Sequence, residues 1–199
     1  MENNKKNKPL IIFDCFGVVI KHDVSMVWLR QTFDEQTIKK IRKDYYPDAD
    51  GGKISGKQLF EKLSYHSGLP ACEIEKIFHS LVEIDNDVIN LIKRLKKNNY
   101  VAMLSNCFSG FLDDIITTYD LQNLFDKVIV SCECGLVKPN KEIYLKLLDE
   151  FAGKFDKVVM IDDNQVNLDG AINCGIENVI LHTDEVDTEN KLKKMAIEI

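Results

Sequence analysis

The stretch "LIIFDCFGVVI", residues 10–20, places one carboxylate, Asp14, at the end of a run of apolar residues. Short apolar runs of this kind are typical of strands in a parallel sheet, which helices cover on both faces. Gly17 follows and permits a sharp turn. The stretch therefore predicts a buried strand whose carboxyl end presents Asp14 at the edge of the sheet where open α/β sheets bind ligands.

Similar apolar runs recur along the chain and alternate with amphipathic stretches, which is the pattern of βαβ units. The predicted strands are residues 10–14, 100–105, 127–131, 157–162 and 178–181. Helices are predicted over residues 87–97, 109–118, 141–151, 166–174 and 184–196. Because such crossovers are right-handed, the simplest topology is a doubly wound, Rossmann-like parallel sheet of the α/β class.

The alternation stops between His22 and Asp85, where we find helical periodicity over residues 24–33, 35–45, 55–65 and 72–81. Ser55 and Gln58 have the spacing of a capping box that opens the third helix. We predict a core domain of residues 1–21 and 86–199 with a helical cap of residues 22–85 inserted as a lid. The alternative is a set of helices that cover one face of the sheet.

One segment of this insert, "DADGG" at residues 48–52, superficially resembles a calcium loop. Counted from Asp48, however, an EF-hand would need different residues at its fifth, sixth and twelfth positions. We therefore interpret it as a tight turn. The aromatic residues of the insert are expected to pack inside the bundle rather than to bind substrate; they include Trp28, Phe33, Tyr45 and Tyr46.

Composition excludes several classes of function. The 199 residues carry a net charge of -6 and no basic stripe, so nucleic acid is not an expected partner. No run approaches the ~18 apolar residues of a membrane span, and the basic "MENNKKNK" is expected to be a short tail rather than a signal peptide. The six cysteines lack a disulfide or zinc-ligand spacing, so we expect a reduced, cytoplasmic protein. The sequence does not specify an oligomeric state.

The predicted strands end in polar residues that parallel pairing would bring together. They are Asp14, Ser105 with Asn106, and Asp162 with Asp163, while Lys138 lies in the loop after the third strand. Carboxylates this close require a cation between them, and hard oxygen ligands suit Mg²⁺. A metal ion, an ammonium and a hydroxyl together form a clamp for an anion such as phosphate.

In such a clamp Asp14 is the natural nucleophile, because a carboxylate can attack phosphorus and form an acyl phosphate that water then hydrolyses. The backbone N–H groups of the next residues are expected to face the phosphate. They belong to Cys15, Phe16 and Gly17.

Four segments, "IIFDCFGVV", "VAMLSN", "GLVKPNKEIY" and "VVMIDDNQVNLDGAINCGI", resemble the four motifs of the haloacid dehalogenase superfamily in the right order. The helical insert is similar to the cap of the subgroup that contains haloacid dehalogenases, phosphoglycolate phosphatase-like enzymes and bacterial α-D-glucose-1-phosphate phosphatases. The resemblance implies that Asp14 is the nucleophile and that Ser105 and Lys138 hold the phosphate. We place Asn106, which follows Ser105, among the substrate-binding residues as well.

The resemblance also implies a magnesium site. Asp14 and Asp163 would bind Mg²⁺, Asp162 would act through water, and the backbone carbonyl of Phe16 would be a further ligand. Asn167 stands where some members carry a second acid on the metal side, and its amide would support only a water.

Phe16 departs from the superfamily pattern, because typical phosphatases carry Asp-x-Asp and use the second Asp to protonate the leaving oxygen. General acid–base help contributes about 10² to 10⁴ in rate. Either the leaving group needs little protonation, or another side chain such as His22 or His66 supplies the proton.

We predict a Mg²⁺-dependent phosphoric monoester hydrolase that acts on a small phosphorylated metabolite, for which a sugar phosphate is one candidate, through an aspartyl-phosphate. Two alternatives remain open. A 2-haloacid dehalogenase needs no leaving-group proton, and a catalytically retired domain would bind a phosphorylated ligand or a protein.

Overall fold

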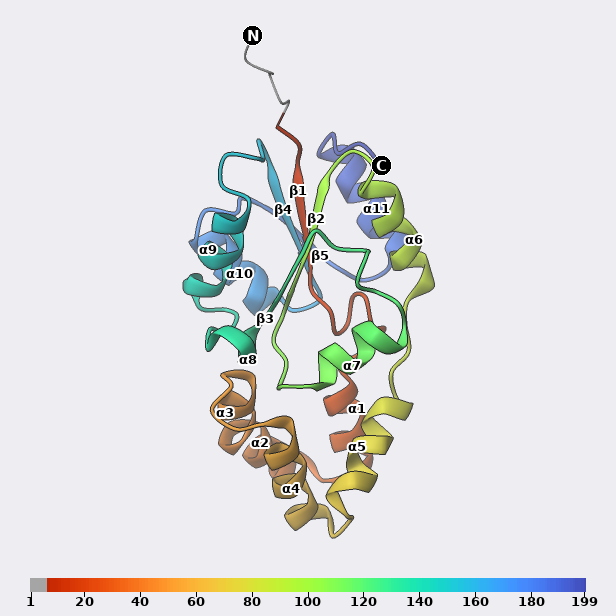
Figure 1. Cartoon of the computed structure of the whole chain (residues 1–199), viewed down its shortest axis with the longest axis vertical. Coiled ribbons are helices and arrows are strands. Elements are labelled where there is room, and N and C mark those ends of the chain that lie inside the picture. Colours follow the sequence, from red (N-terminus) through yellow and green to blue (C-terminus); the bar gives the residue numbers. More distant parts are fainter. Residues whose placement is uncertain (1–6) are drawn as a thin grey trace.

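The computed structural model describes residues 7–199, so most of the predicted N-terminal tail lies outside it. Its centre is a parallel sheet of β1 (Leu10–Phe13), β2 (Tyr100–Ser105), β3 (Lys127–Val130), β4 (Val158–Asp162) and β5 (Asn178–Leu181). The strand order is β3-β2-β1-β4-β5, so the chain winds outward from β1 in both directions (Figure 1). The predicted doubly wound α/β fold is confirmed, and β1 is its central strand.

Helices cover the sheet on both faces (Figure 1). On one side lie α6 (Asn86–Leu95) and α11 (Glu185–Lys194), and on the other α9 (Lys141–Glu150) and α10 (Gln165–Asn173). The strand β1 contributes to both cores, because alternate residues point to opposite faces. Leu10 and Ile12 pack with α9 and α10, whereas Ile11 and Phe13 belong to the core that contains α6. Four completely buried residues in a row therefore fix β1 between two helical layers.

Two further helices lie at the carboxyl end of the sheet. The first, α7 (Phe111–Thr118), follows β2, and its predicted start at residue 109 is two residues early. The second, α8 (Ser131–Cys134), was not predicted, because a single turn of four residues is too short to show helical periodicity.

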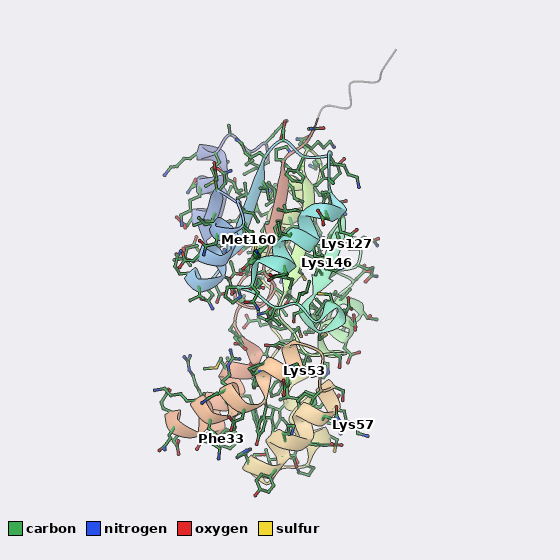
Figure 2. The ribbon with its side chains drawn as sticks, turned by 90° about the vertical axis from the view of Figure 1, so that its left-hand side faces the viewer. Phe33, Lys53, Lys57, Lys127, Lys146 and Met160 are labelled. Atoms are coloured by element: carbon green, nitrogen blue, oxygen red, sulfur yellow. The ribbon has the colours of Figure 1, made fainter. Side chains whose placement is uncertain are left out.

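Beyond the carboxyl ends of the strands, five helices form a body of their own, which we call the helical bundle. They are α1 (Val24–Thr32), α2 (Glu35–Asp44), α3 (Tyr46–Asp50), α4 (Gly56–Ser67) and α5 (Ala71–Ser80). Figure 2 shows Phe33 and Lys57 on this bundle, far from Met160 in the sheet. The predicted capping box is present, since Ser55 accepts from the backbone of Gln58 and the Gln58 side chain accepts from the backbone of Ser55.

The helix α3 corrects the prediction of a tight turn over residues 48–52. Asp48 and Asp50 are helical, and the turn is confined to the two glycines that follow. The cause is Pro47 in the first turn of α3, where its fixed φ angle favours a helix start. The aromatic residues of the bundle have two different surroundings. Trp28 is buried against Phe33 and Phe78, as predicted, whereas Tyr46 lines a cavity described below.

Two glycines of the bundle make close backbone contacts with the rest of the fold, in addition to the aromatic packing of Phe60 and Phe78 against Phe108. A Cβ atom at Gly52 would lie 2.2 Å from the carbonyl oxygen of Cys132, so the two backbones meet there without room for a side chain. The backbone N–H of Gly56 donates to Oγ of Ser109 across 3.1 Å. These contacts hold α3 and α4 against the carboxyl end of the sheet. None of the helices in residues 7–199 has the length and apolar character that crossing a membrane requires.

Candidate active site

The ends of β1 and β4 and the loop after α8 meet at one point. The ammonium nitrogen of Lys138 lies 2.7 Å from Oδ1 of Asp14 and 2.8 Å from Oδ2 of Asp162. The Lys138 side chain is only 1% exposed, and neither carboxylate is more than 9% exposed. Because parallel register places these residues at one edge, the predicted convergence of Asp14, Asp162 and Lys138 is present.

Burial and charge act in opposite directions at this point. Burial raises the pKa of Asp14, and the Lys138 ammonium holds it lower than burial alone would. Burial lowers the pKa of Lys138, but the carboxylates of Asp14 and Asp162 outweigh that effect and raise it above its ordinary value. Lys138 is therefore a permanent cation, buried between two carboxylates.

The neighbouring backbone and side chains hold Asp162 in place. Its Oδ1 accepts from the backbone N–H of Asn164 across 2.9 Å, and the amide of Asn167 donates to both oxygens at 3.0 and 3.1 Å. Tyr144 in turn donates to the carbonyl oxygen of Asn167 across 2.7 Å. Sequence reasoning missed Asn164 and Tyr144, because one acts through its backbone and the other lies among apolar residues of α9. Asn167 thus positions Asp162.

The third carboxylate, Asp163, is exposed and lies over the turn that follows β1. Gly17 has a φ of +86°, and a Cβ atom there would lie 2.2 Å from Oδ2 of Asp163. Only glycine permits this approach. One carboxylate oxygen from each of Asp14, Asp162 and Asp163 lies within 4.8 Å of the others, which is a spacing that a single cation can bridge.

The loop that carries Lys138 is fixed from two sides. The side-chain amide of Asn106 donates to the carbonyl oxygen of Lys138 and accepts from its backbone N–H, both across 2.9 Å. On the other side, Gly170 of α10 comes so close that a Cβ atom would lie 2.4 Å from the carbonyl oxygen of Pro139. Asn106, predicted as a substrate ligand, therefore holds the lysine loop with its side chain.

The turn after Asp14 folds back on itself. The carbonyl oxygen of Cys15 accepts from the N–H groups of Val19 and Ile20 at 2.8 Å, and the Gly17 N–H donates to Ile20 across 2.7 Å. The N–H of Cys15 donates to Oδ1 of Asp14 across 2.6 Å. Three N–H groups were expected to face a phosphate. Those of Cys15 and Gly17 form hydrogen bonds within the turn, so only the N–H of Phe16 remains available to a phosphate.

A cavity of about 380 Å³ opens between this centre and the helical bundle. Five of the predicted site residues line it: Asp14, Phe16, Asn106, Lys138 and Asp163. Ser105 and Cys15 are completely buried behind its floor. Phe108, Phe111 and Phe16 form an apolar wall.

The opposite side of the cavity comes from the bundle and was not predicted as part of the site. Besides Val24, it consists of five polar residues: Asp23, Ser25, Arg42, Tyr46 and Asp50. Helical periodicity tells which residues are apolar but not which polar ones face inward, so no sequence signal marked them. We call these five residues the polar wall.

Neither histidine proposed as a proton donor lines this cavity. Nε2 of His22 lies 2.9 Å from the carbonyl oxygen of Leu81, and Nε2 of His66 lies 2.8 Å from Oη of Tyr45. Both rings contact residues of the bundle or its edge and not the cavity, so neither is placed to donate a proton there.

The arrangement of a strand-end carboxylate, a buried lysine and an acidic pair matches a known family. The model of the haloacid dehalogenase-like hydrolases matches residues 8–175. The chain belongs to this family. The resemblance inferred from the four motifs is confirmed, and with it the prediction that the chain is a hydrolase.

Individual relatives are more distant. The chain is 25% identical over 183 residues to pyrimidine 5′-nucleotidase YjjG of Escherichia coli (strain K12), covering 85% of this hydrolase and 80% of the relative. It is 24% identical over 189 residues to sesquiterpene phosphatase astK of Aspergillus oryzae, covering 93% and 95%. These phosphatase relatives, together with the family, support the predicted phosphoric monoester hydrolase activity.

Solved structures confirm the fold. A haloacid dehalogenase family enzyme of Bacteroides thetaiotaomicron, crystallised with magnesium and inorganic phosphate, superposes with a TM-score of 0.69. The two are 23% identical, and the match covers 89% of this chain and 94% of that one.

Proposed function

We propose that this hydrolase is a Mg²⁺-dependent phosphomonoesterase that cleaves a small phosphorylated metabolite by means of Asp14. One observation carries the proposal: a buried lysine ammonium is held between two carboxylates on the floor of a cavity of substrate size. Two of the three ammonium protons are used on Asp14 and Asp162, and the third is available to a phosphate oxygen. The helical bundle, residues 22–85 in our domain prediction, serves as the cap over this cavity.

The donor set fits a magnesium ion. Three carboxylates lie within reach of one cation, and Lys138 neutralises only one of their charges. Hard oxygen donors are those that Mg²⁺ prefers. The oxygens of Asp162 already accept from Lys138, Asn164 and Asn167, so Asp14 and Asp163 would hold the ion directly and Asp162 through water. The carbonyl of Phe16 would be a further ligand. When bound, the ion offsets the charge of the phosphate oxygens.

The reaction we propose has two displacements at phosphorus. A carboxylate oxygen of Asp14 attacks, the bond from phosphorus to the leaving oxygen breaks, and an aspartyl-phosphate remains. A water molecule then forms the new bond to phosphorus and loses a proton to solvent, the bond to Asp14 breaks, and the Asp14 carboxylate and inorganic phosphate are released. Because Phe16 supplies no proton, the leaving oxygen takes one from solvent, so the first step favours good leaving groups. Sugar phosphates that leave through an anomeric oxygen meet this requirement.

The test is phosphate release from p-nitrophenyl phosphate by the purified chain, with added Mg²⁺ and with EDTA. We expect release that depends on Mg²⁺ and falls by about 10³ or more in Asp14→Asn, because the nucleophile is gone. Asp44→Asn, an exposed carboxylate of α2, is the matched control and should keep the wild-type rate.

Full activity in Asp14→Asn, or activity that EDTA leaves unchanged, would contradict the proposal. Halide release from a 2-haloacid without phosphate release would instead identify a dehalogenase. A thermal shift with phosphorylated ligands and no turnover would identify a binding domain.

A further inference from the structure

The polar wall, opposite the apolar phenylalanine wall, is an unusual lining for a cavity whose reactive groups all lie on the sheet. Its members come from the start of α1, from α2 and from α3. They carry one guanidinium, two carboxylates and two hydroxyls, so the wall offers both donors and acceptors of hydrogen bonds. Polar groups in a substrate cavity set its specificity, because leaving them unpaired is unfavourable.

Asp50 is one member of the polar wall with unmet hydrogen-bonding capacity. Arg42, the nearest cation, pairs with Asp23 at 3.7 Å and not with Asp50. Among the described residues no other cation reaches the Asp50 carboxylate, although most of the side chain is buried. Burial raises the pKa of Asp50 to about 6, and the nearby charge of Arg42 offsets that rise only in part. A buried carboxyl group without a partner is destabilising, so a ligand that satisfies it is favoured.

Arg42 has donors to spare as well. Its guanidinium stacks on the ring of Tyr46, 4.6 Å from the centroid, which fixes its plane. Its other contacts are long, with Nη1 3.4 Å from Oγ of Ser25. A guanidinium has five N–H donors, so most of them face the cavity or solvent. Tyr46 Oη is buried beside the Ser25 side chain, and no described residue lies in good hydrogen-bonding geometry with it.

The position of Asp50 is fixed by the fold. It is the last residue of α3, and two residues later Gly52 packs against the carbonyl oxygen of Cys132 in the core domain. Asp50 and Arg42 therefore face the cavity from a rigid corner of the bundle. A hydroxyl group is a small neutral group that can both donate to a carboxylate and accept from a guanidinium through one oxygen atom.

We propose that Arg42 and Asp50 bind hydroxyl groups of the leaving group, so that the preferred substrates are phosphate monoesters of polyhydroxylated compounds. The inference rests on the proposed function, because it assumes that the phosphoryl group lies at Asp14. Phosphate esters that carry a carboxylate are disfavoured, because the two negative charges of Asp23 and Asp50 exceed the single positive charge of Arg42 and would repel such a carboxylate. Purely apolar leaving groups are disfavoured because they would leave both groups unpaired.

The test measures binding, so that leaving-group reactivity does not enter. The full chain carrying Asp14→Asn is titrated with myo-inositol 1-phosphate and with cyclohexyl phosphate, which share a six-membered ring and differ in hydroxyl groups. We expect the inositol ester to bind at least tenfold more tightly. Adding Asp50→Asn should raise the Kd of myo-inositol 1-phosphate about tenfold or more, because this ester loses a charged hydrogen bond. The Kd of cyclohexyl phosphate should change by less than about threefold, because this ester makes no such bond.

Adding Asp44→Asn in place of Asp50→Asn is the matched control, and both Kd values should stay unchanged. Equal affinity for the two esters, or an equal loss for both in the Asp50→Asn variant, would overturn the inference. So would tighter binding of 3-phosphoglycerate than of the inositol ester. Absence of turnover in the wild-type chain would contradict the proposed function alone, because the binding comparison is read without catalysis.

Discussion

The ring of Phe16 stacks on the ring of Phe111, with centroids 6.1 Å apart and planes only 4° apart. Phe111 continues the stack to Phe108, at 5.2 Å and 17°. Phe16 therefore belongs to an aromatic wall that is continuous with the core of the bundle. The position that carries a proton donor in many relatives of the superfamily is here part of the packing between core domain and bundle, which explains how an apolar residue is retained beside a charged site.

Replacing Phe16 by Asp tests whether the missing donor limits the rate. We expect Phe16→Asp to raise kcat/KM for alkyl phosphates about tenfold or more and to change aryl phosphates little, because only poor leaving groups need protonation. The loss of ring packing should lower the free energy of unfolding by about 2 kcal/mol. Rates across esters of graded leaving-group pKa provide the measurement. An unchanged dependence on leaving-group pKa in a folded variant would show that the proton comes from elsewhere.

Lys138 should be essential for both stability and activity. Lys138→Met keeps the length of the side chain but leaves buried carboxylates without their cation, and we expect a loss of about 3–5 kcal/mol in unfolding free energy measured by urea in EDTA. Phosphatase activity should fall by about 10² to 10³. The double variant Lys138→Met/Asp162→Asn removes one repelling charge, so it should regain part of the stability and none of the activity. A Lys138→Met protein as stable as wild type would rule out the charge balance described above.

Gly17 offers a test of the carboxylate cluster. Gly17→Ala should raise the Mg²⁺ concentration needed for half-maximal activity by about tenfold or more, because a methyl group there displaces Asp163. Gly68→Ala is the matched control: its φ of +75° imposes the same backbone strain of about 1 kcal/mol, but nothing lies within 4 Å of the added methyl. Gly68→Ala therefore reports the backbone strain alone, and Gly17→Ala should lose at least as much thermal stability. If both showed the wild-type response to Mg²⁺, the proposed role of Asp163 would be wrong.

The core of the site was predictable because parallel strands impose their own geometry. An apolar run fixes β1 as a buried strand, and parallel pairing with β4 then places Asp14 and the Asp162–Asp163 pair at one edge. The positions of these residues in the sequence are enough for that prediction, and no knowledge of side-chain positions is needed. The strand ends were accordingly predicted within one residue.

The parts that escaped prediction depend on packing between elements distant in sequence. Nothing in "DYYPDADGG" shows that Tyr46 and Asp50 face Asp14, since that follows from the contact of Gly52 with Cys132. The engagement of Asn106 with the Lys138 backbone likewise depends on how two loops meet. Amphipathic patterns reveal the buried face of a helix, but they do not tell which polar residues turn toward a cavity.

The raised pKa of Asp50 predicts the direction in which the stability of the protein changes with pH. The pKa of Asp50 rises from 3.8 to about 6 in the folded protein, chiefly through burial and against the influence of Arg42, so the native state binds the proton more tightly than the unfolded state. Between about pH 4 and pH 6 the native state therefore carries more protons, and the free energy of unfolding falls as the pH rises.

Asp50→Asn cannot ionise and lacks this fall. We expect it to match wild type near pH 4 and to exceed it by about 2 kcal/mol above pH 6, a value reduced from the full linkage because Asp50 is partly exposed. Calorimetric melting of both proteins across this range, with Asp44→Asn as the surface-charge control, provides the measurement. A stability difference that does not change with pH would contradict the raised pKa. A variant that gains stability while losing affinity for the inositol ester would show that Asp50 serves the ligand at the expense of the fold.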